Sequence, residues 1–383
     1  MINQRLLSRI KGIDWDFPGV PSESKFSAIH WYPGRFASQI PAALIGLLSE
    51  PGETVLDPFA GSGTTLVEAQ RLRRRSVGIE LSPIGALIAS GKTLAVSAMQ
   101  VQKMANELLE HARNALVAAD MERRDHISTP AAVQGDKWYA PSVFRHLGAL
   151  WRVVNEQSGP SQVLARLAFS AVLLPVCRET RHWGYVCDNS TPKSDRVGNV
   201  IVAFGEVLAR LCDAYAERDA EYRARGDGIA EISSAEVLNG DALSLAPRLP
   251  AGGADLVVTS PPYSGVCDYV KAQRLSMEWF GCDIEPLRQL EIGARSKRHR
   301  GNAQEGYISE MGAVLRALRR CLRPDGTAAI IVGQSAERQA TLPTVLKALK
   351  DADFEVRLNV NRRVSSRRRQ NPSIRGEHLL IAS

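Results

Sequence analysis

Residues 55–65 read VLDPFAGSGTT, an apolar run that ends at an acidic residue and passes through a glycine-rich turn into a helix-forming run. A second apolar run, SVGIEL at 76–81, follows after the predicted helix. A strand, a tight turn, a helix and another strand make a βαβ unit, which needs a parallel sheet covered by helices. This stretch therefore predicts an α/β fold, with Asp57, Gly61 and Gly63 at the sheet edge where ligands bind.

The rest of the chain predicts a single sheet interrupted by helices. Apolar residues recur every three or four positions in the middle block, for example at Val101, Met104 and Leu108. Runs such as DLVVT and TAAIIVG resume after residue 232 and are apolar on both faces, as strands buried between helices are. We expect a doubly wound, mostly parallel, Rossmann-like sheet built from residues 1–96 and 233–383. We expect residues 97–232 to form a helical insertion between these two blocks.

Helical periodicity also predicts the extent of individual helices. One is expected over TTLVEAQRLRRR (64–75), directly after the glycine turn. Another is expected over WYAPSVFRHLGALWRVV (138–154), within the insertion.

The acidic residues at three strand ends narrow the kind of ligand. The turn lacks the G-x-G-x-x-G spacing of dinucleotide sites and the Gly-Lys-Ser/Thr of phosphate-binding loops. Glu80 closes the next strand, where a carboxylate can accept the hydroxyls of a ribose, and Asp241 follows a later strand, where it can accept from an amine. These acids favour a nucleoside with a cationic or amine-bearing group over a polyphosphate. A tight βα turn without a ligand is the alternative for the glycines alone.

Three motifs in order carry a family resemblance. DPFAGSGTT (57–65), GIELSPIG (78–85) and TSPPY (259–263) together resemble the amino-group DNA methyltransferases, which use S-adenosylmethionine to methylate N4 of cytosine or N6 of adenine. HWYPGRFASQIPAAL (30–44) is similar to the family segment over the methionine end of the cofactor, and residues 263–281 resemble the stretch after the catalytic motif. The resemblance implies a class I methyltransferase fold, S-adenosylmethionine as cofactor and double-stranded DNA as partner.

The resemblance also assigns site residues. Those expected at the cofactor are His30, Tyr32, Arg35, Phe36, Asp57, Pro58, Phe59, Gly61, Gly63, Thr64, Glu80, Leu81, Asp241 and Ala242. The expected catalytic residues are Ser260, Pro261, Pro262 and Tyr263. The Ser260 side chain and the Pro261 carbonyl would accept the two amino hydrogens of a flipped base, on which Tyr263 would stack.

The residue before the two prolines bears on the substrate. In this family Ser is commoner among enzymes that act on N4 of cytosine, whereas adenine enzymes mostly carry Asp or Asn. We therefore expect a cytosine-N4 methyltransferase, with adenine N6 as the alternative. An RNA guanine-N2 methyltransferase is less favoured, because that class carries Asp or Asn before the prolines and no separate RNA-binding domain is recognisable here.

Clusters of basic residues indicate where DNA would bind. The chain holds 48 Lys and Arg against 41 Asp and Glu, a net charge of +7, which favours an anionic partner. Two runs concentrate this charge, and the residues expected at DNA are Arg295, Lys297, Arg298, Arg300, Arg367, Arg368 and Arg369. Segment 178–195 mixes Arg, aromatic and small polar residues, which fits a loop that reads base edges. The insertion at 97–232, which contains this segment, is therefore the candidate target-recognition region. A solvated surface is the alternative for the two charged runs, and a surface loop packed on the helices is the alternative for segment 178–195.

Several classes of protein are not expected. The six cysteines are scattered without a CxxC pair, and Cys177, His182 and Cys187 lack the spacing of a zinc site, so we expect reduced thiols and no metal. No run resembles a signal peptide or a membrane span, which favours a cytoplasmic protein with no membrane contact. No nuclease or helicase motif is present, so any restriction activity would require a cognate protein of a restriction or defence system.

Overall fold

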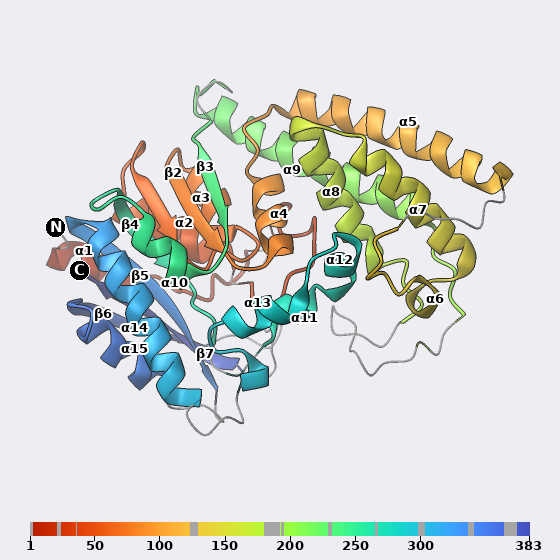
Figure 1. Cartoon of the computed structure of the whole chain (residues 1–383). Coiled ribbons are helices and arrows are strands. Elements are labelled where there is room, and N and C mark those ends of the chain that lie inside the picture. The colour runs from red at the N-terminus through yellow and green to blue at the C-terminus, as the bar shows by residue number, and fades with distance from the viewer. Residues whose placement is uncertain are drawn as a thin grey trace.

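The computed structural model describes residues 3–20, 24–35, 37–122, 129–179, 192, 195–228, 232–263, 265, 267–297, 303–335, 341–363 and 374–383. The strands of this part of the chain form one sheet. They are β1 (Thr54–Asp57), β2 (Arg75–Glu80), β3 (Ala235–Asn239), β4 (Ala254–Thr259), β5 (Leu322–Ser335), β6 (Val356–Arg363) and β7 (Ile374–Ala382). Their order is β3-β2-β1-β4-β5-β7-β6 (Figure 1). Only β7 runs antiparallel to its neighbours, so the predicted mostly parallel, doubly wound sheet is confirmed.

The strand order reverses between β1 and β4. These two strands pair in parallel, with Val55 opposite Leu256 and Leu56 opposite Val257. The chain leaves β1 toward β2 on one side and leaves β4 toward β5 on the other, which opens a crevice at the carboxyl ends of both strands. The glycine turn and the SPPY segment therefore start side by side.

Helices cover both faces of the sheet. One face carries α1 (Gln4–Lys11), α2 (Gln39–Leu48) and α3 (Thr64–Arg71), and the other carries α10 (Ala242–Leu245), α14 (Ala303–Cys321) and α15 (Thr341–Lys350). Side chains along β4 alternate between the two cores: Val258 packs with the first group and Val257 with the second. This explains why the strand is apolar on both faces.

A block of helices lies beside the sheet, between β2 and β3 in the chain (Figure 1). After α4 (Pro83–Lys92) it contains α5 (Ala98–Glu122), α6 (Gly135–Trp138), α7 (Pro141–Asn155), α8 (Gly159–Leu173) and α9 (Val200–Ala224). Downstream of β4, the chain forms α11 (Tyr269–Ala272), α12 (Arg274–Trp279) and α13 (Ile284–Leu290). Trp279 at the end of α12 packs edge-on against Phe169 of α8 and Trp151 of α7. The segment after the SPPY motif is thus anchored on the helical block.

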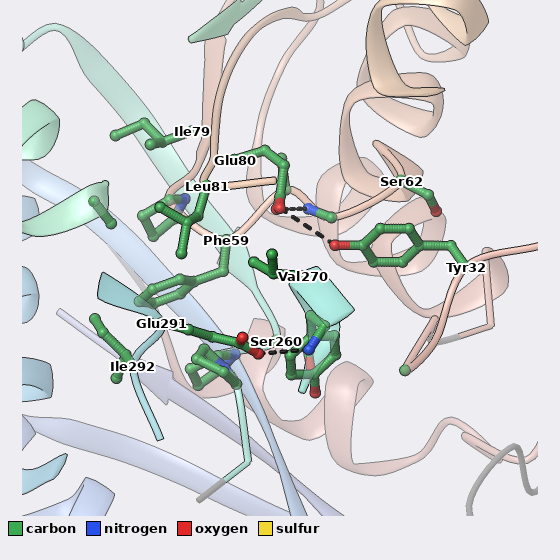
Figure 2. Close-up of a pocket in the computed structure, with 18 of the residues that line it drawn as sticks. Tyr32, Phe59, Ser62, Ile79, Glu80, Leu81, Ser260, Val270, Glu291 and Ile292 are labelled. Atoms are coloured by element: carbon green, nitrogen blue, oxygen red, sulfur yellow. Dashed lines mark hydrogen bonds between the residues drawn. The ribbon is translucent and has the colours of Figure 1, made fainter. Parts of the chain in front are cut away.

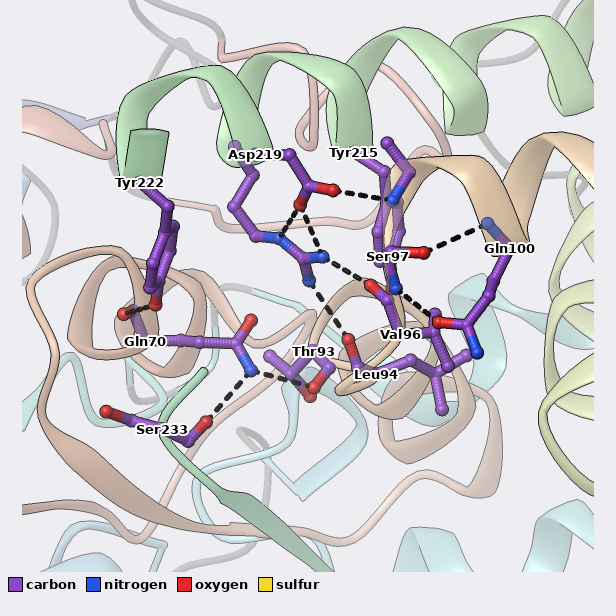
Figure 3. Close-up of polar contacts among 12 residues, drawn as sticks. Gln70, Thr93, Leu94, Val96, Ser97, Gln100, Tyr215, Asp219, Tyr222 and Ser233 are labelled. Atoms are coloured by element: carbon purple, nitrogen blue, oxygen red, sulfur yellow. Dashed lines mark hydrogen bonds and ion pairs between the residues drawn. The ribbon is translucent and has the colours of Figure 1, made fainter. Parts of the chain in front are cut away.

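Polar contacts join the last helix of this block, α9, to the segment at which the chain enters the block (Figure 3). Arg218 of α9 is 1% exposed, pairs with Asp219 at 2.8 Å and donates to the carbonyl oxygens of Leu94 and Val96. Asp219 in turn accepts the backbone N–H of Ala98 at the start of α5. Because a buried ion pair is stable only when its remaining donors and acceptors are satisfied, this network holds the two ends of the block together.

Two helices differ from their predicted extents. The helix after the glycine turn ends at Arg71, because Arg73 adopts a left-handed φ of 62° and the chain turns into β2 at Arg75. The single helix expected over 138–154 is divided into α6 and α7. Ala140 precedes Pro141, and a residue before proline is held in an extended conformation, so α7 begins at the proline.

Within the described residues, no helix combines the length and apolar character that crossing a bilayer requires.

Candidate active site

A pocket of about 860 Å³ empty volume opens at the carboxyl edge of β1, β2 and β4 (Figure 2). The predicted site residues that line it are Tyr32, Arg35, Pro58, Phe59, Gly61, Thr64, Glu80, Leu81, Asp241, Ala242, Ser260, Pro261, Pro262 and Tyr263. His30, Asp57 and Gly63 do not line it, and Phe36 lies outside the described residues. The pocket therefore brings together residues predicted from five separate stretches of the sequence.

The glycines serve different purposes in the turn after β1. Gly61 has a φ of 53° and lines the pocket, where a side chain would approach the Tyr32 ring to 3.2 Å. Gly63 lies beneath the pocket as the N-cap of α3, with a φ of 78°, and a Cβ there would be 2.8 Å from the Cα of Ala89 in α4. Gly63 therefore allows close packing of two helices, while Gly61 leaves the pocket open.

Asp57 is buried under the site and joins two strands. Its Oδ1 accepts the Thr259 hydroxyl at 2.6 Å and the Phe59 N–H at 3.0 Å. Burial raises the pKa of Asp57 to about 6, although the hydrogen bond from Thr259 opposes this shift. Asp57 thus holds the ends of β1 and β4 together at the point where the glycine turn and the SPPY segment begin.

Glu80 lines the pocket and already accepts three hydrogen bonds. Its Oε2 accepts the Gly61 N–H at 2.8 Å, and its Oε1 accepts the Tyr32 hydroxyl at 3.2 Å (Figure 2). Oε1 also accepts the Ser82 N–H at 2.8 Å. Burial raises the pKa of Glu80 to about 7. A carboxylate offers about four lone-pair sites, so a ligand hydroxyl can use the fourth or replace Tyr32.

Asp241 caps the short helix α10. Its Oδ1 accepts the Leu243 N–H at 3.1 Å and its Oδ2 accepts the Ser244 hydroxyl at 3.0 Å. These bonds fix the carboxylate at the wall of the pocket next to Ala242.

His30 is drawn away from the pocket by a buried chain of hydrogen bonds. Its Nδ1 contacts the Trp31 carbonyl at 2.6 Å, and its Nε2 contacts the Ser170 hydroxyl of α8, which contacts Ser276 of α12 at 2.7 Å. Burial lowers the pKa of His30 to about 4, so the ring is neutral at pH 7. Since a neutral ring donates from Nδ1 to the carbonyl, Nε2 accepts from Ser170. His30 therefore links the upstream segment to the helical block.

The SPPY segment is held from two sides. The Ser260 Oγ and the Tyr263 hydroxyl are 3.1 Å apart, and the Tyr307 hydroxyl donates to the Pro262 carbonyl at 3.0 Å. The Pro261 carbonyl accepts no hydrogen bond from a described residue. When the Ser260 hydroxyl donates to Tyr263, both lone pairs of Ser260 remain as acceptors.

Sequence reasoning missed a further wall of the pocket. Five residues outside the predicted site also line it: Tyr269, Val270, Leu290, Glu291 and Ile292. Tyr269 and Val270 fall within the stretch 263–281 that resembles the family, whereas the other three belong to no motif used above. They reach the pocket because residues 290–297 run alongside the loop after SPPY. The N–H of Gly265 donates to the Gly293 carbonyl at 2.6 Å, and the N–H of Arg295 donates to the Cys267 carbonyl at 3.2 Å. No local signal in the sequence indicates this pairing.

The predicted DNA-binding residues are only partly described. Arg295 and Lys297 lie in the short turn η3 (Arg295–Lys297), next to the loop after SPPY, and Lys297 is 3.8 Å from Glu310. The residues that lie outside the described part are Arg298, Arg300, Arg367, Arg368 and Arg369. Most of the segment 178–195 also lies outside it, as do His182 and Cys187. In the described residues no group of three or more His, Cys, Asp or Glu could hold a metal ion.

Comparisons with known proteins agree with the motif order. A family model described as "DNA methylase", of the N6/N4 methyltransferases, matches residues 4–87. The chain is similar to the type II methyltransferase M.MjaII of Methanocaldococcus jannaschii, at 22% identity over 84% of this chain and 75% of the relative. It is also similar to M.BsoBI of Geobacillus stearothermophilus, at 24% identity over 70% of this chain and 55% of the relative.

Another relative matches a shorter part of the chain at a higher sequence identity. M.SmaI of Serratia marcescens is 46% identical over 16% of this chain and 23% of the relative. Among solved structures, the rRNA methyltransferase AviRa of Streptomyces viridochromogenes aligns over 96% of this chain and 94% of its own, at 11% identity and a TM-score of 0.37. The family's motifs gather around one pocket, the family model matches residues 4–87 and relatives are matched along most of the chain, which together support an S-adenosylmethionine-dependent amino-group (N6/N4) DNA methyltransferase.

Proposed function

We propose that this chain transfers a methyl group from S-adenosylmethionine to the exocyclic N4 amine of a cytosine in double-stranded DNA. The observation that carries the proposal is the presence of Ser260 in the same pocket as Glu80, Asp241 and the glycine turn. An acceptor for an amine thus faces the space where a nucleoside cofactor would lie.

The pocket suits the cofactor in chemistry. Glu80 and Asp241 would hold the hydroxyl and amine groups of the nucleoside, while Phe59, Leu81 and Pro261 supply apolar walls. S-adenosylmethionine, when bound, supplies a methyl group on a positively charged sulfur. The acidic lining favours such a charge.

Ser260 and the Pro261 carbonyl would orient the reacting amine. The amine of a base is conjugated with the ring and is a weak nucleophile, so it must be drawn out of the plane by acceptors. The proline ring fixes φ at Pro261 and Pro262, and the bond from Tyr307 to the Pro262 carbonyl restrains the segment further. Such positioning can contribute roughly 7–11 kcal/mol to catalysis.

The base must leave the duplex to reach this pocket, since its amine is otherwise paired and stacked. Arg295 and Lys297 would contact phosphates beside the flipped nucleotide, because the segment that carries them is bonded to the loop after SPPY. The segment from Arg178 to Asp195 is our candidate for reading the target sequence. A chimaera in which a relative's residues replace this segment should change the methylated sequence, and an unchanged preference would exclude that role.

The test compares three variants with the wild type. Ser260→Ala and Tyr263→Ala should abolish methyl transfer to duplex DNA while the dissociation constant for S-adenosylmethionine stays nearly unchanged in calorimetry. Ser90→Ala, which lies in α4 away from the pocket lining, is the matched control and should remain active. Full activity of either site variant would refute the assigned roles.

Mass spectrometry of the digested DNA identifies the methylated atom. N4-methylcytosine is expected; N6-methyladenine would replace the proposal with the adenine alternative. Transfer RNA offered to the same preparation tests the guanine-N2 alternative. Methylation of RNA with none of DNA would overturn the assignment of DNA as substrate.

A further inference from the structure

Glu291 is a buried carboxylate in the pocket that the motifs did not indicate. It follows α13, is 4% exposed and lines the same pocket as Ser260. Its Oε1 accepts the backbone N–H of Tyr269 at 2.5 Å, while its Oε2 has no hydrogen-bond partner among the described residues. Figure 2 shows the Glu291 carboxylate reaching into the pocket, on the side where Ser260 lies. One oxygen of the Glu291 carboxylate is therefore hydrogen-bonded to the protein, whereas the other bonds to no described residue.

The other carboxylates of the pocket are already occupied on both oxygens. Glu80 accepts from Gly61, Ser82 and Tyr32, and Asp241 accepts from Leu243 and Ser244. Among the described lining residues, Glu291 alone presents a carboxylate oxygen with no donor. Leaving a buried polar atom unsatisfied typically costs about 1–3 kcal/mol, and more for a charged group. Such an atom is expected to meet a donor when the pocket is filled.

The proposed reaction creates a donor that needs an acceptor. The nitrogen lone pair forms the new N–C bond, the C–S bond breaks with its electrons going to sulfur, and the methylated amine must then lose one proton. The Ser260 hydroxyl can accept a hydrogen bond from the amine, but it cannot hold an additional proton at neutral pH. A carboxylate can take the proton and become a neutral carboxylic acid.

We propose that Glu291 is the catalytic base of this site, with Oε2 taking the proton that the exocyclic amine releases on methylation. The proposal rests on the function proposed above. Burial supports it, because burial is the main cause that raises the pKa of Glu291 to about 8, near the operating range of a general base. The backbone N–H groups of Tyr269 and Val270 lower that pKa, whereas the nearby charges of Asp268 and Glu80 raise it. The groups facing Glu291 also include Tyr32, Tyr269 and Cys267.

The experiment measures single-turnover methyl transfer at saturating cofactor and duplex DNA for Glu291→Gln. This variant keeps an oxygen for the Tyr269 N–H and removes the base. The rate should fall about 100-fold or more, as for loss of a general base, with dissociation constants for cofactor and DNA close to wild type. The matched control is Glu278→Gln, a buried Glu in α12 that pairs with Arg274 outside the pocket, and it should stay near the wild-type rate.

Two further readouts do not depend on the rate alone. Difference infrared spectra of the wild-type and Glu278→Gln product complexes should show a newly protonated carboxyl group, and Glu291→Gln should lack it. The single-turnover rate of the wild type should rise with pH as the base ionises, and this rise should vanish in Glu291→Gln. If the Gln variant does not fold, Glu291→Asp, which shortens the side chain by one methylene, should show an intermediate loss of rate.

The outcomes separate the two proposals. Wild-type rates in Glu291→Gln, or in Glu291→Asp if that variant is used, would overturn the role of Glu291 while the methyltransferase function stands. Weakened cofactor binding with an unchanged rate at saturation would also overturn it, because the free oxygen would then face the ammonium group of the cofactor. If the wild type methylates no nucleic acid, the proposed function fails and the role of Glu291 fails with it.

Discussion

Thr259→Val should destabilise the protein by an amount that depends on pH. The Thr259 hydroxyl donates to Asp57 Oδ1 at 2.6 Å, and both residues are 1% exposed. Valine keeps the volume of the side chain and removes the donor. Asp57 then retains the Phe59 N–H and loses its shortest hydrogen bond.

The size of the effect follows from the charge on Asp57, whose pKa burial raises to about 6. At pH 8 the carboxylate is ionised, and losing a hydrogen bond to a charged group costs about 1.5–3 kcal/mol. At pH 5 the group is mostly protonated, and the loss should approach the roughly 1 kcal/mol of a neutral hydrogen bond. The substitution raises the folded pKa further above the unfolded value of about 3.9. A carboxyl group whose folded pKa lies above its unfolded pKa stabilises the folded protein at low pH, and this stabilisation is lost as pH rises between the two pKa values. The free energy of unfolding of the variant should therefore fall more than that of the wild type between pH 5 and pH 8.

Urea unfolding of both proteins at pH 5 and pH 8 measures this difference. Thr327→Val is the matched control, since Thr327 is a buried residue of the neighbouring strand β5 whose hydroxyl bonds to no described residue. We expect the control to change stability equally at both pH values. A loss in Thr259→Val that is the same at pH 5 and pH 8 would refute the assigned coupling between Thr259 and the Asp57 charge.

Other substitutions test the packing and the charge of the site. Gly333→Ala should slow methyl transfer by up to about 100-fold in single-turnover assays. A Cβ at this position would lie 2.3 Å from the Tyr263 ring and would displace it. The affinity for the cofactor should equal that of the wild type. Gly63→Ala should lower the stability to urea by about 1–3 kcal/mol, since it combines a φ of 78° with a Cβ 2.8 Å from the Ala89 Cα. Replacing Arg295 and Lys297 with Gln should weaken the salt dependence of DNA binding. The slope of the logarithm of the binding constant against the logarithm of salt concentration should become less steep by about one for each phosphate that the variant no longer neutralises. An unchanged slope would place the DNA elsewhere.

The sheet and much of the site could be predicted because their signals are local. A strand that ends in an acid and enters a glycine turn specifies a βα unit, and the parallel sheet brings the strand ends to one edge. Glu80 ends one strand, Asp241 and Ser260 follow two others, and all three line the pocket as this reasoning requires. The prediction of one helix over 138–154 was wrong, because it relied on helical periodicity and neglected the effect of Pro141 on the conformation of Ala140.

Side-chain direction and distant pairing could not be predicted. Asp57 and Glu80 both end strands, but β1 lies beside β4, so Asp57 turns toward Thr259 beneath the pocket. His30 belongs to the motif over the cofactor, yet the Ser170 hydroxyl, 140 residues away, holds it in the core. Glu291 enters the pocket through hydrogen bonds between loops, which leave no periodic trace in a sequence.

The segment 290–297 connects DNA binding to the chemistry that we propose. Glu291 at one end faces the pocket and holds the Tyr269 N–H, while the Ser296 N–H near the other end donates to Asp268 Oδ1 at 2.9 Å. Arg295 and Lys297 lie on the same segment. Because Gly265, Cys267 and Asp268 are hydrogen-bonded to this segment, phosphates held by the two cations would also fix the position of Glu291. Substituting these cations should therefore lower the rate at saturating DNA as well as the affinity, whereas cations that serve only to attract DNA would change the affinity alone.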